Sequence, residues 1–175
     1  MVYYGEEIGM GEQMSLPGRL VVRAPMQWAA YDNGGFSHAS PKCFVRPMVS
    51  DGPFGFEHSN VASQRADPGS LLNWMAELIR TRRESSEIGA GPCRILDTGD
   101  EAVLGIRHGG DDSAIITLNN LSDRRTTITL DLAEREMMTA TDLFGSRKYA
   151  PIDAENRSFR LEGYGYRWLR LGGIY

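Results

Sequence analysis

The chain has 175 residues, of which 19 are basic and 23 acidic, giving a formal net charge of −4. This length suffices for one domain of ordinary size with a buried core, or for one domain with an appended segment. The net charge argues against a nucleic-acid partner, and so does the lack of a basic run, because the arginine pairs Arg82-Arg83 and Arg124-Arg125 stand alone.

Cysteine spacing and hydropathy argue against a metal site and against a membrane-spanning helix. Neither Cys43 nor Cys93 has a histidine or another cysteine at metal-ligand spacing, so we expect two reduced thiols, no metal and no cofactor. No window approaches the ~20 apolar residues of a membrane helix, and the first residues lack the basic start of a secretory signal. We therefore expect a protein of the cytoplasm with no membrane partner.

Residues 1–4 resemble the end of a buried strand, followed at once by a glycine and two acids. So short a strand needs partners that the neighbouring sequence does not supply, which suggests that the chain starts inside a larger fold. Residues 5–66 are rich in turn formers and far longer than an ordinary loop. Such a stretch indicates a functional loop, neighbouring parts that would order it, or both.

Residues 18–37 combine arginine, tryptophan, phenylalanine and glycine in one irregular segment. Loops on rigid scaffolds carry most ligand contacts. The alternative is a disordered arm, but polar disordered arms rarely carry methionine and aromatic residues so close together. The composition favours a piece of a binding site.

One helix is predicted over residues 68–86. Asp67 is a preferred N-cap and Pro68 suits the first helical position, while Gly89 or Gly91 would end the helix. Apolar residues recur at helical spacing and are expected to face a core. They are Leu71, Leu72, Met75, Leu78 and Ile79.

After Pro92 the pattern changes to short apolar or β-branched segments separated by turn formers. The segments are 94–96, 102–107, 113–118, 126–132, 137–143, 158–161 and 166–171. Short strands at this spacing predict an antiparallel sandwich, and the alternation over 126–132 predicts one buried and one wet face. The expected fold is mainly β: a C-terminal antiparallel β-sandwich preceded by one long helix and an extended loop segment.

Three runs in order carry a resemblance to a known family. They are Tyr3 to Met10, Arg19 to Trp28 with Asn33 to Ser37, and Asn60 to Trp74. Together they resemble the end of the α-amylase family (glycoside hydrolase family 13), most closely the trehalose synthases (maltose α-D-glucosyltransferases) and related α-glucosidases. The closing run, Gly163 to Leu171, also resembles the last strand of the C-terminal β-domain of those enzymes.

The resemblance implies that residues 1–88 are the end of a (β/α)8 barrel, with its eighth strand, a long loop and its eighth helix. Residues 89–175 would be the C-terminal β-sandwich domain. The partner would be the missing N-terminal barrel of the same enzyme, and the full-length enzyme would act on α-linked glucose disaccharides by glucosyl transfer, isomerisation or hydrolysis. Retaining glycosidases need two carboxylates about 5 Å apart, which this family takes from earlier barrel strands. Those motifs are absent, so we expect no catalytic residue here and no activity from the chain alone.

The resemblance also implies substrate-binding residues. Arg19, by its spacing to Arg23, matches the family position whose guanidinium reaches the sugar in the innermost pocket, where a planar fork of donors suits hydroxyl groups. Arg23 would support the loop or contact the substrate. Trp28 and Phe36 would stack on a sugar ring or anchor the loop.

Two residues differ from the family pattern, and one pair of acidic residues could be mistaken for a catalytic site. Leu20 and Ala24 stand where the family usually has Asp and Thr, which leaves the substrate preference open. Glu6 and Glu7 suggest a carboxylate pair, but adjacent residues at a strand end point to opposite sides, so we expect both to be scaffolding.

Two other functions remain open from sequence. The sandwich and its terminal aromatic residues would also fit a non-catalytic sugar-binding or interaction module. Alternatively, the sandwich only covers a barrel surface and binds no ligand.

Overall fold

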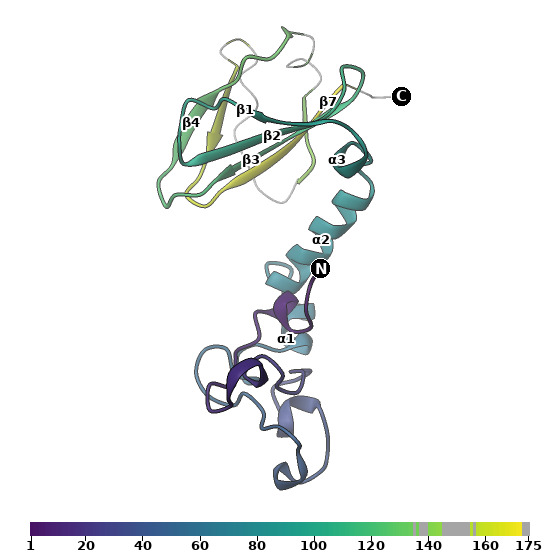
Figure 1. Cartoon of the computed structure of the whole chain (residues 1–175), viewed down its shortest axis with the longest axis vertical. Helices are drawn as coiled ribbons and strands as arrows, with labels where there is room; N and C mark the ends of the chain where they lie inside the picture. Colours follow the sequence, from purple (N-terminus) through teal and green to yellow (C-terminus); the bar gives the residue numbers. More distant parts are fainter. Residues whose placement is uncertain (135, 137–139, 145–154, 156, 173–175) are drawn as a thin grey trace. The chain divides into compact units, whose positions relative to one another are not determined.

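The computed structural model describes residues 1–134, 136, 140–144, 155 and 157–172 (Figure 1). The chain divides into two compact units, Met1–Arg80 and Thr81–Tyr175. None of the described helices is long and apolar enough to cross a membrane.

The first unit consists of short helical turns joined by loops. Its elements are η1 (Glu6–Ile8), η2 (Gly18–Leu20), η3 (Asp32–Gly35), η4 (Pro41–Cys43), α1 (Val61–Ala66) and the start of α2 (Leu71–Arg83). Residues 1–4 form no strand and are exposed, so the prediction of a buried strand end is wrong for the described chain. A strand needs a neighbour for its backbone hydrogen bonds, and the described residues provide none for this segment.

A small apolar core holds the first unit together. Ile8, Met26 and Val61 are buried, and Met10 and Leu72 pack against them. These residues come from the start of the chain, the loop 18–37, α1 and α2. The long loop segment is therefore folded back on itself.

Gln64 in α1 joins three parts of this unit. Its Nε2 donates to the carbonyl oxygen of Ile8 at 2.7 Å, and its Oε1 accepts from the backbone N–H of Leu72 at 3.0 Å. Leu72 lies in the first turn of α2, where backbone N–H groups lack helical partners. Gln64 thus satisfies one of these groups and fixes α2 against the start of the chain.

The start of α2 differs from the prediction. Asp67 Oδ1 accepts from the backbone N–H of Gly69 at 2.9 Å, so Asp67 closes a turn before the helix. The helix begins at Leu71, and Ser70 Oγ accepts from the N–H of Asn73 at 3.2 Å. Ser70 is therefore the N-cap, and the prediction that Asp67 caps the helix is wrong. Asp67 and Ser70 are both of a residue type that favours the N-cap position, and the sequence alone does not choose between them.

The apolar stripe of α2 is not enclosed. The helix has no buried residue: Leu71 and Ile79 are exposed, and Leu72, Met75 and Leu78 are half-buried. The prediction that the stripe faces a core holds for Leu72, which packs against the core of the first unit, and is wrong for the exposed Leu71 and Ile79 within the described chain. The helix also ends at Arg83, earlier than predicted, and a separate short helix, α3 (Glu87–Ala90), follows.

The second unit is an antiparallel sandwich, as predicted. Its strands are β1 (Cys93–Leu96), β2 (Val103–Gly109), β3 (Ala114–Asn120), β4 (Thr126–Thr129), β5 (Thr141–Asp142), β6 (Ser158–Leu161) and β7 (Tyr166–Leu171). One sheet has the order β1-β2-β3-β7-β5, the other pairs β4 with β6, and all pairings are antiparallel. The predicted segment 137–143 lies partly outside the described residues, and its described end contains β5.

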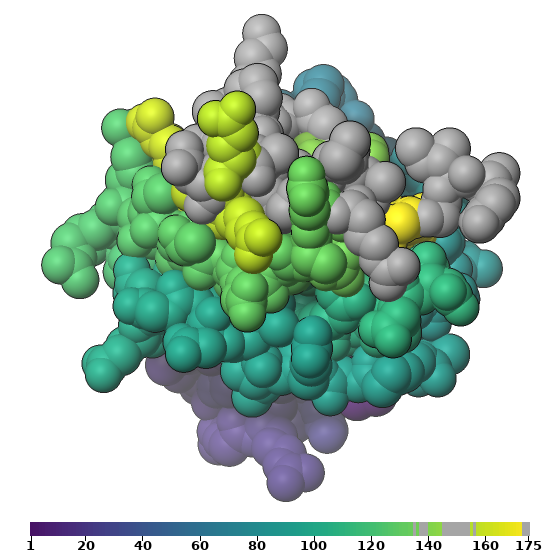
Figure 2. All heavy atoms as spheres, turned by 90° about the horizontal axis from the view of Figure 1, so that it is seen from above, coloured from purple at the N-terminus to yellow at the C-terminus, as the bar shows by residue number. Residues whose placement is uncertain are grey.

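Both sheets contribute side chains to one buried core. Ile128 and Leu130 are buried while Thr127 and Thr129 are exposed, which confirms the predicted alternation. Phe159 of β6 is fully buried in the same cluster. Figure 2 shows the surface of this unit, with the green residues of the β4 region beside the yellow-green residues of β6.

Two arginines occupy core-facing positions of the larger sheet. Arg107 of β2 is buried, and its Nη1 lies 2.7 Å from Glu136 Oε1. Arg167 of β7 is also buried, with its Nε 3.0 Å from Asp142 Oδ2. Buried charges need such partners, because an unpaired charge in the interior is strongly destabilising.

The other face of this sheet carries α3. Glu87 Oε1 accepts from Ser113 Oγ at 2.6 Å and lies 3.6 Å from Arg170 Nε. Burial acts to raise the pKa of Glu87, but the bond from Ser113, its own backbone N–H and the charge of Arg170 together lower that pKa below its usual value. Glu87 is therefore ionised at neutral pH and ties α3 to β3 and β7.

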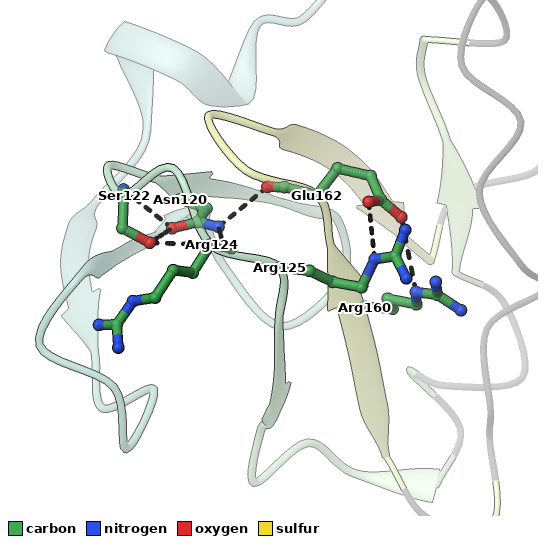
Figure 3. Close-up of polar contacts among 6 residues, drawn as sticks. All are labelled: Asn120, Ser122, Arg124, Arg125, Arg160 and Glu162. Atoms are coloured by element: carbon green, nitrogen blue, oxygen red, sulfur yellow. Dashed lines mark hydrogen bonds and ion pairs between the residues drawn. The ribbon is translucent and has the colours of Figure 1, made fainter.

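The connections from β3 to β4 and from β6 to β7 are among those that cross between the sheets. Asn120 links them: its Nδ2 donates to the carbonyl oxygens of Arg124 at 2.6 Å and Glu162 at 2.9 Å (Figure 3). Its Oδ1 accepts from the backbone N–H and the hydroxyl of Ser122, at 3.0 and 2.8 Å. Asn120 is buried, so these bonds satisfy an amide that water does not reach.

Candidate substrate-binding loop

Residues 18–37 form an ordered loop in the structure. The backbone N–H of Trp28 donates to the carbonyl oxygen of Gly34 at 2.7 Å. The carbonyl oxygens of Gln27 and Trp28 accept from the N–H groups of Val61 and Ala62, at 3.1 and 3.0 Å. These carbonyl oxygens thereby accept hydrogen bonds from backbone N–H groups of the first turn of α1, which have no partners within the helix. The loop is ordered, and the alternative of a disordered arm is excluded.

The turn at Asn33 and Gly34 depends on its residue types. Both residues are left-handed, with φ of 56° and 61°. The side-chain amide of Asn33 donates to the carbonyl oxygens of Ser37 at 2.7 Å and Ala39 at 2.9 Å. Gly34 suits this turn because its positive φ is unfavourable for other residues, and a Cβ there would also lie 2.7 Å from Met48 Cε and require that side chain to move.

Several candidate polar residues are scaffolding. Gln27 is buried, and its Nε2 donates to the carbonyl oxygens of Ser59 and Phe54. Glu6 Oε2 accepts from the N–H of Tyr3 at 3.0 Å, and Glu7 Oε2 from that of Gly5 at 2.8 Å. The scaffolding role predicted for Glu6 and Glu7 is confirmed, although both lie in the η1 turn and not at a strand end.

Arg23 and Phe36 line a pocket of about 520 Å³ in the first unit. The ring of Phe36 packs edge to face on Phe44, with centroids 6.0 Å apart at 73°. Tyr4 Oη donates to the carbonyl oxygen of Ala24 at 2.9 Å and closes one side. The complete lining is Tyr4, Arg23, Ala24, Pro25, Met26, Phe36, Ser37, Ala39, Cys43, Phe44, Val45 and Arg46.

The pocket is positively charged and contains no carboxylate among its lining residues. Burial raises the pKa of Tyr4, with a further contribution from Tyr3, while the nearby charges of Arg23 and Arg46 act to lower it. The net direction is upward, so the Tyr4 phenol is neutral at physiological pH. The pocket can supply hydroxyl and guanidinium donors and aromatic faces, but it holds no group of its own for carboxylate acid–base chemistry.

The structure brings together two of the four predicted site residues. Arg19 is exposed on η2 and does not line the pocket, and Trp28 is 48% exposed outside it. Sequence reasoning missed Phe44 and Arg46, which lie in a stretch without a recognisable motif. No group of three or more potential metal ligands occurs among the described residues.

Comparisons with known proteins place the chain in a family. Residues 112–170 match the family model described as sucrose hydrolase-like, C-terminal domain. The chain is 36% identical to the trehalose synthase of Pimelobacter sp. over 98% of its own length and 30% of that protein. It is 34% identical to the trehalose synthase/amylase TreS of Mycobacterium tuberculosis, covering 98% of the chain and 29% of that protein.

A solved structure supports the same relationship. The α-amylase from H. orenii superposes with a TM-score of 0.73 at 25% identity, over 97% of this chain and 32% of that one. The chain therefore spans about a third of the length of the relatives it matches, and corresponds to their C-terminal part. The chain belongs to the α-amylase family, glycoside hydrolase family 13, and corresponds to the C-terminal part of the trehalose synthases it matches.

Proposed function

We propose that the chain is the C-terminal segment of a cytoplasmic enzyme that acts on α-linked glucose disaccharides, by trehalose synthase-like glucosyl transfer and isomerisation or by hydrolysis. In this proposal residues 1–88 end a (β/α)8 barrel and residues 89–175 are its C-terminal domain. The loop 18–37 is one wall of the sugar site. The catalytic carboxylates belong to the missing N-terminal barrel, which is the partner of this segment.

The observation that carries the proposal is the pocket lined by Arg23 and Phe36. Its two arginines and two phenylalanines suit sugar hydroxyls and ring faces. The lack of a lining carboxylate fits a wall that faces acids from another part of the enzyme. The unenclosed apolar stripe on α2 likewise fits a helix whose packing partner lies in that missing barrel.

The aromatic residues of the last strand do not favour a separate sugar-binding role for β7. Phe144 packs edge to face on Tyr166 and Trp168, with centroid distances of 5.4 and 5.1 Å. Phe144 is buried, and the two β7 rings cover it. Both β7 residues are half-buried, and each ring makes an edge-to-face contact within the sandwich.

Replacement of Phe36 by alanine in the complete enzyme tests the pocket. The loss of an aromatic face should raise KM for maltose about threefold to tenfold, with little change in thermal stability, because Phe36 is 49% exposed. The measurement is steady-state kinetics beside Phe54→Ala, a matched exposed phenylalanine outside the pocket. Equal KM values for both variants and the parent enzyme would remove Phe36 from the sugar site.

A further inference from the structure

The pocket of the first unit is built by the most basic part of an acidic chain. Residues 13–50 contain one acid, Asp32, and four basic residues, which are Arg19, Arg23, Lys42 and Arg46. The whole chain, in contrast, has a formal net charge of −4. Positive charge is therefore concentrated in the segments that line the pocket.

Arg23 and Arg46 both line this pocket without a carboxylate partner. Neither side chain makes an ion pair or a hydrogen bond within the described part of the chain, and no acid is among the lining residues. The buried arginines of the sandwich differ, because Arg107 and Arg167 are each paired with an acid. Two guanidinium groups without partners in one pocket indicate an anion from outside the chain.

The charges of the two arginines act on the same part of the pocket. Tyr4 Oη donates to the carbonyl oxygen of Ala24 at 2.9 Å, which fixes the phenol, and both arginine charges act to lower the pKa of Tyr4. Both guanidinium groups are therefore within Coulombic range of one hydroxyl. Like charges in such an arrangement repel each other unless an anion binds near both. The Tyr4 proton is committed to Ala24, so the charged donors for this anion are the guanidinium N–H groups.

A phosphoryl group matches this pair of charges better than one carboxylate from the missing barrel does. A phosphate monoester carries about 1.5 to 2 negative charges at neutral pH, on oxygens that guanidinium groups bind in bidentate pairs. One carboxylate has a single charge and would leave one of the two arginines without a counter-charge. Arg23 is exposed and Arg46 is half-buried, so a ligand from solvent reaches both.

The remaining lining suits a sugar attached to the phosphoryl group. The pocket has a volume of about 520 Å³, within the range of small-molecule sites, and Phe36 offers a flat face beside the arginines. We propose that Arg23 and Arg46 bind the phosphoryl group of a phosphorylated glucose, which occupies the pocket in competition with the neutral disaccharide. The choice of glucose as the sugar rests on the proposed function.

Isothermal titration of the chain with glucose 1-phosphate, glucose 6-phosphate, inorganic phosphate and glucose tests this proposal. At least one sugar phosphate should bind about tenfold or more tightly than glucose, and more tightly than inorganic phosphate. Arg46→Gln and Arg23→Gln should each weaken this binding at least about tenfold, because each removes a charge-assisted contact. Both variants should keep the unfolding midpoint of the parent, since neither arginine has a partner in the described chain. Arg65→Gln, at an exposed arginine outside the pocket, should bind as the parent does.

The same sugar phosphate should compete with maltose in the complete enzyme, and Arg46→Gln should raise its inhibition constant at least about tenfold. The proposal is overturned if neither sugar phosphate binds the chain, if both arginine variants bind as the parent does, or if glucose binds as tightly as its phosphates. Inorganic phosphate bound as tightly as the sugar phosphates would also overturn it, because the site would then serve the free anion.

Binding by the chain without inhibition of the complete enzyme would contradict the proposal as well, because carboxylates of the missing barrel would then occupy the arginines. Turnover of maltose that is insensitive to both sugar phosphates overturns this inference and leaves the proposed function intact. Absence of any action on maltose or trehalose, with sugar phosphate still bound by the chain, overturns the proposed function instead. The two failures are therefore distinguishable.

Discussion

Replacement of Asn120 by alanine is expected to lower the free energy of unfolding of the sandwich by about 2–4 kcal/mol. The change leaves the carbonyl oxygens of Arg124 and Glu162 without the amide that now reaches them at 2.6 and 2.9 Å. It also removes the acceptor of the Ser122 N–H. A buried polar group that loses its partner pays its full desolvation cost. The measurement is urea unfolding followed by tryptophan fluorescence.

Asn119→Ala is the matched control for this experiment. Asn119 is the preceding residue of β3, is half-buried, and has no side-chain hydrogen bond within the described part of the chain. The nearby ion pairs of Glu162 with Arg125 and Arg160 are exposed and contribute little. If both asparagine variants lose the same small amount of stability, Asn120 does not hold the two connections together.

Arg19→Ala in the complete enzyme is expected to reduce kcat/KM for maltose by about 10²-fold, the typical cost of removing one directed donor from an active site. The reason is the contact of its guanidinium with the sugar that the family resemblance implies; Arg19 does not itself line the pocket of Arg23 and Phe36. The stability of the isolated chain should not change, because Arg19 is exposed and makes no ion pair or side-chain hydrogen bond among the described residues.

Arg65→Ala provides the control, since Arg65 is an exposed arginine on α1 in the same unit. Its kinetics should match those of the parent enzyme. An Arg19→Ala enzyme with unchanged kcat/KM would show that this arginine is an ordinary surface residue. A loss of stability that parallels the loss of activity would instead indicate that Arg19 supports the fold of the loop.

The sandwich could be predicted because the sequence of its strands shows which side chains are buried. Alternation of apolar and polar residues, as at Ile128 and Thr129, reports directly which side chains face a core. Arg107 and Arg167 interrupt this pattern, and their partners Glu136 and Asp142 lie far away in sequence. Only the fold brings these charges together.

The helix and the loop were harder to predict for two different reasons. Asp67 and Ser70 are both suitable caps, and the choice between them depends on which carboxylate or hydroxyl meets a free N–H in three dimensions. Composition and resemblance predict a site in the loop 18–37. Phe44 and Arg46 could not be found that way, because they join the pocket only after the chain folds back past η4.

The proposed function requires that the chain supply a wall of the sugar site and none of its catalytic acids. The direct test compares the 175-residue chain with the complete enzyme, incubated with maltose and with trehalose and followed by NMR of the sugars. We predict no turnover by the chain, and interconversion or hydrolysis of these disaccharides by the complete enzyme. Turnover by the chain alone, or no action of the complete enzyme on either disaccharide, would contradict the account.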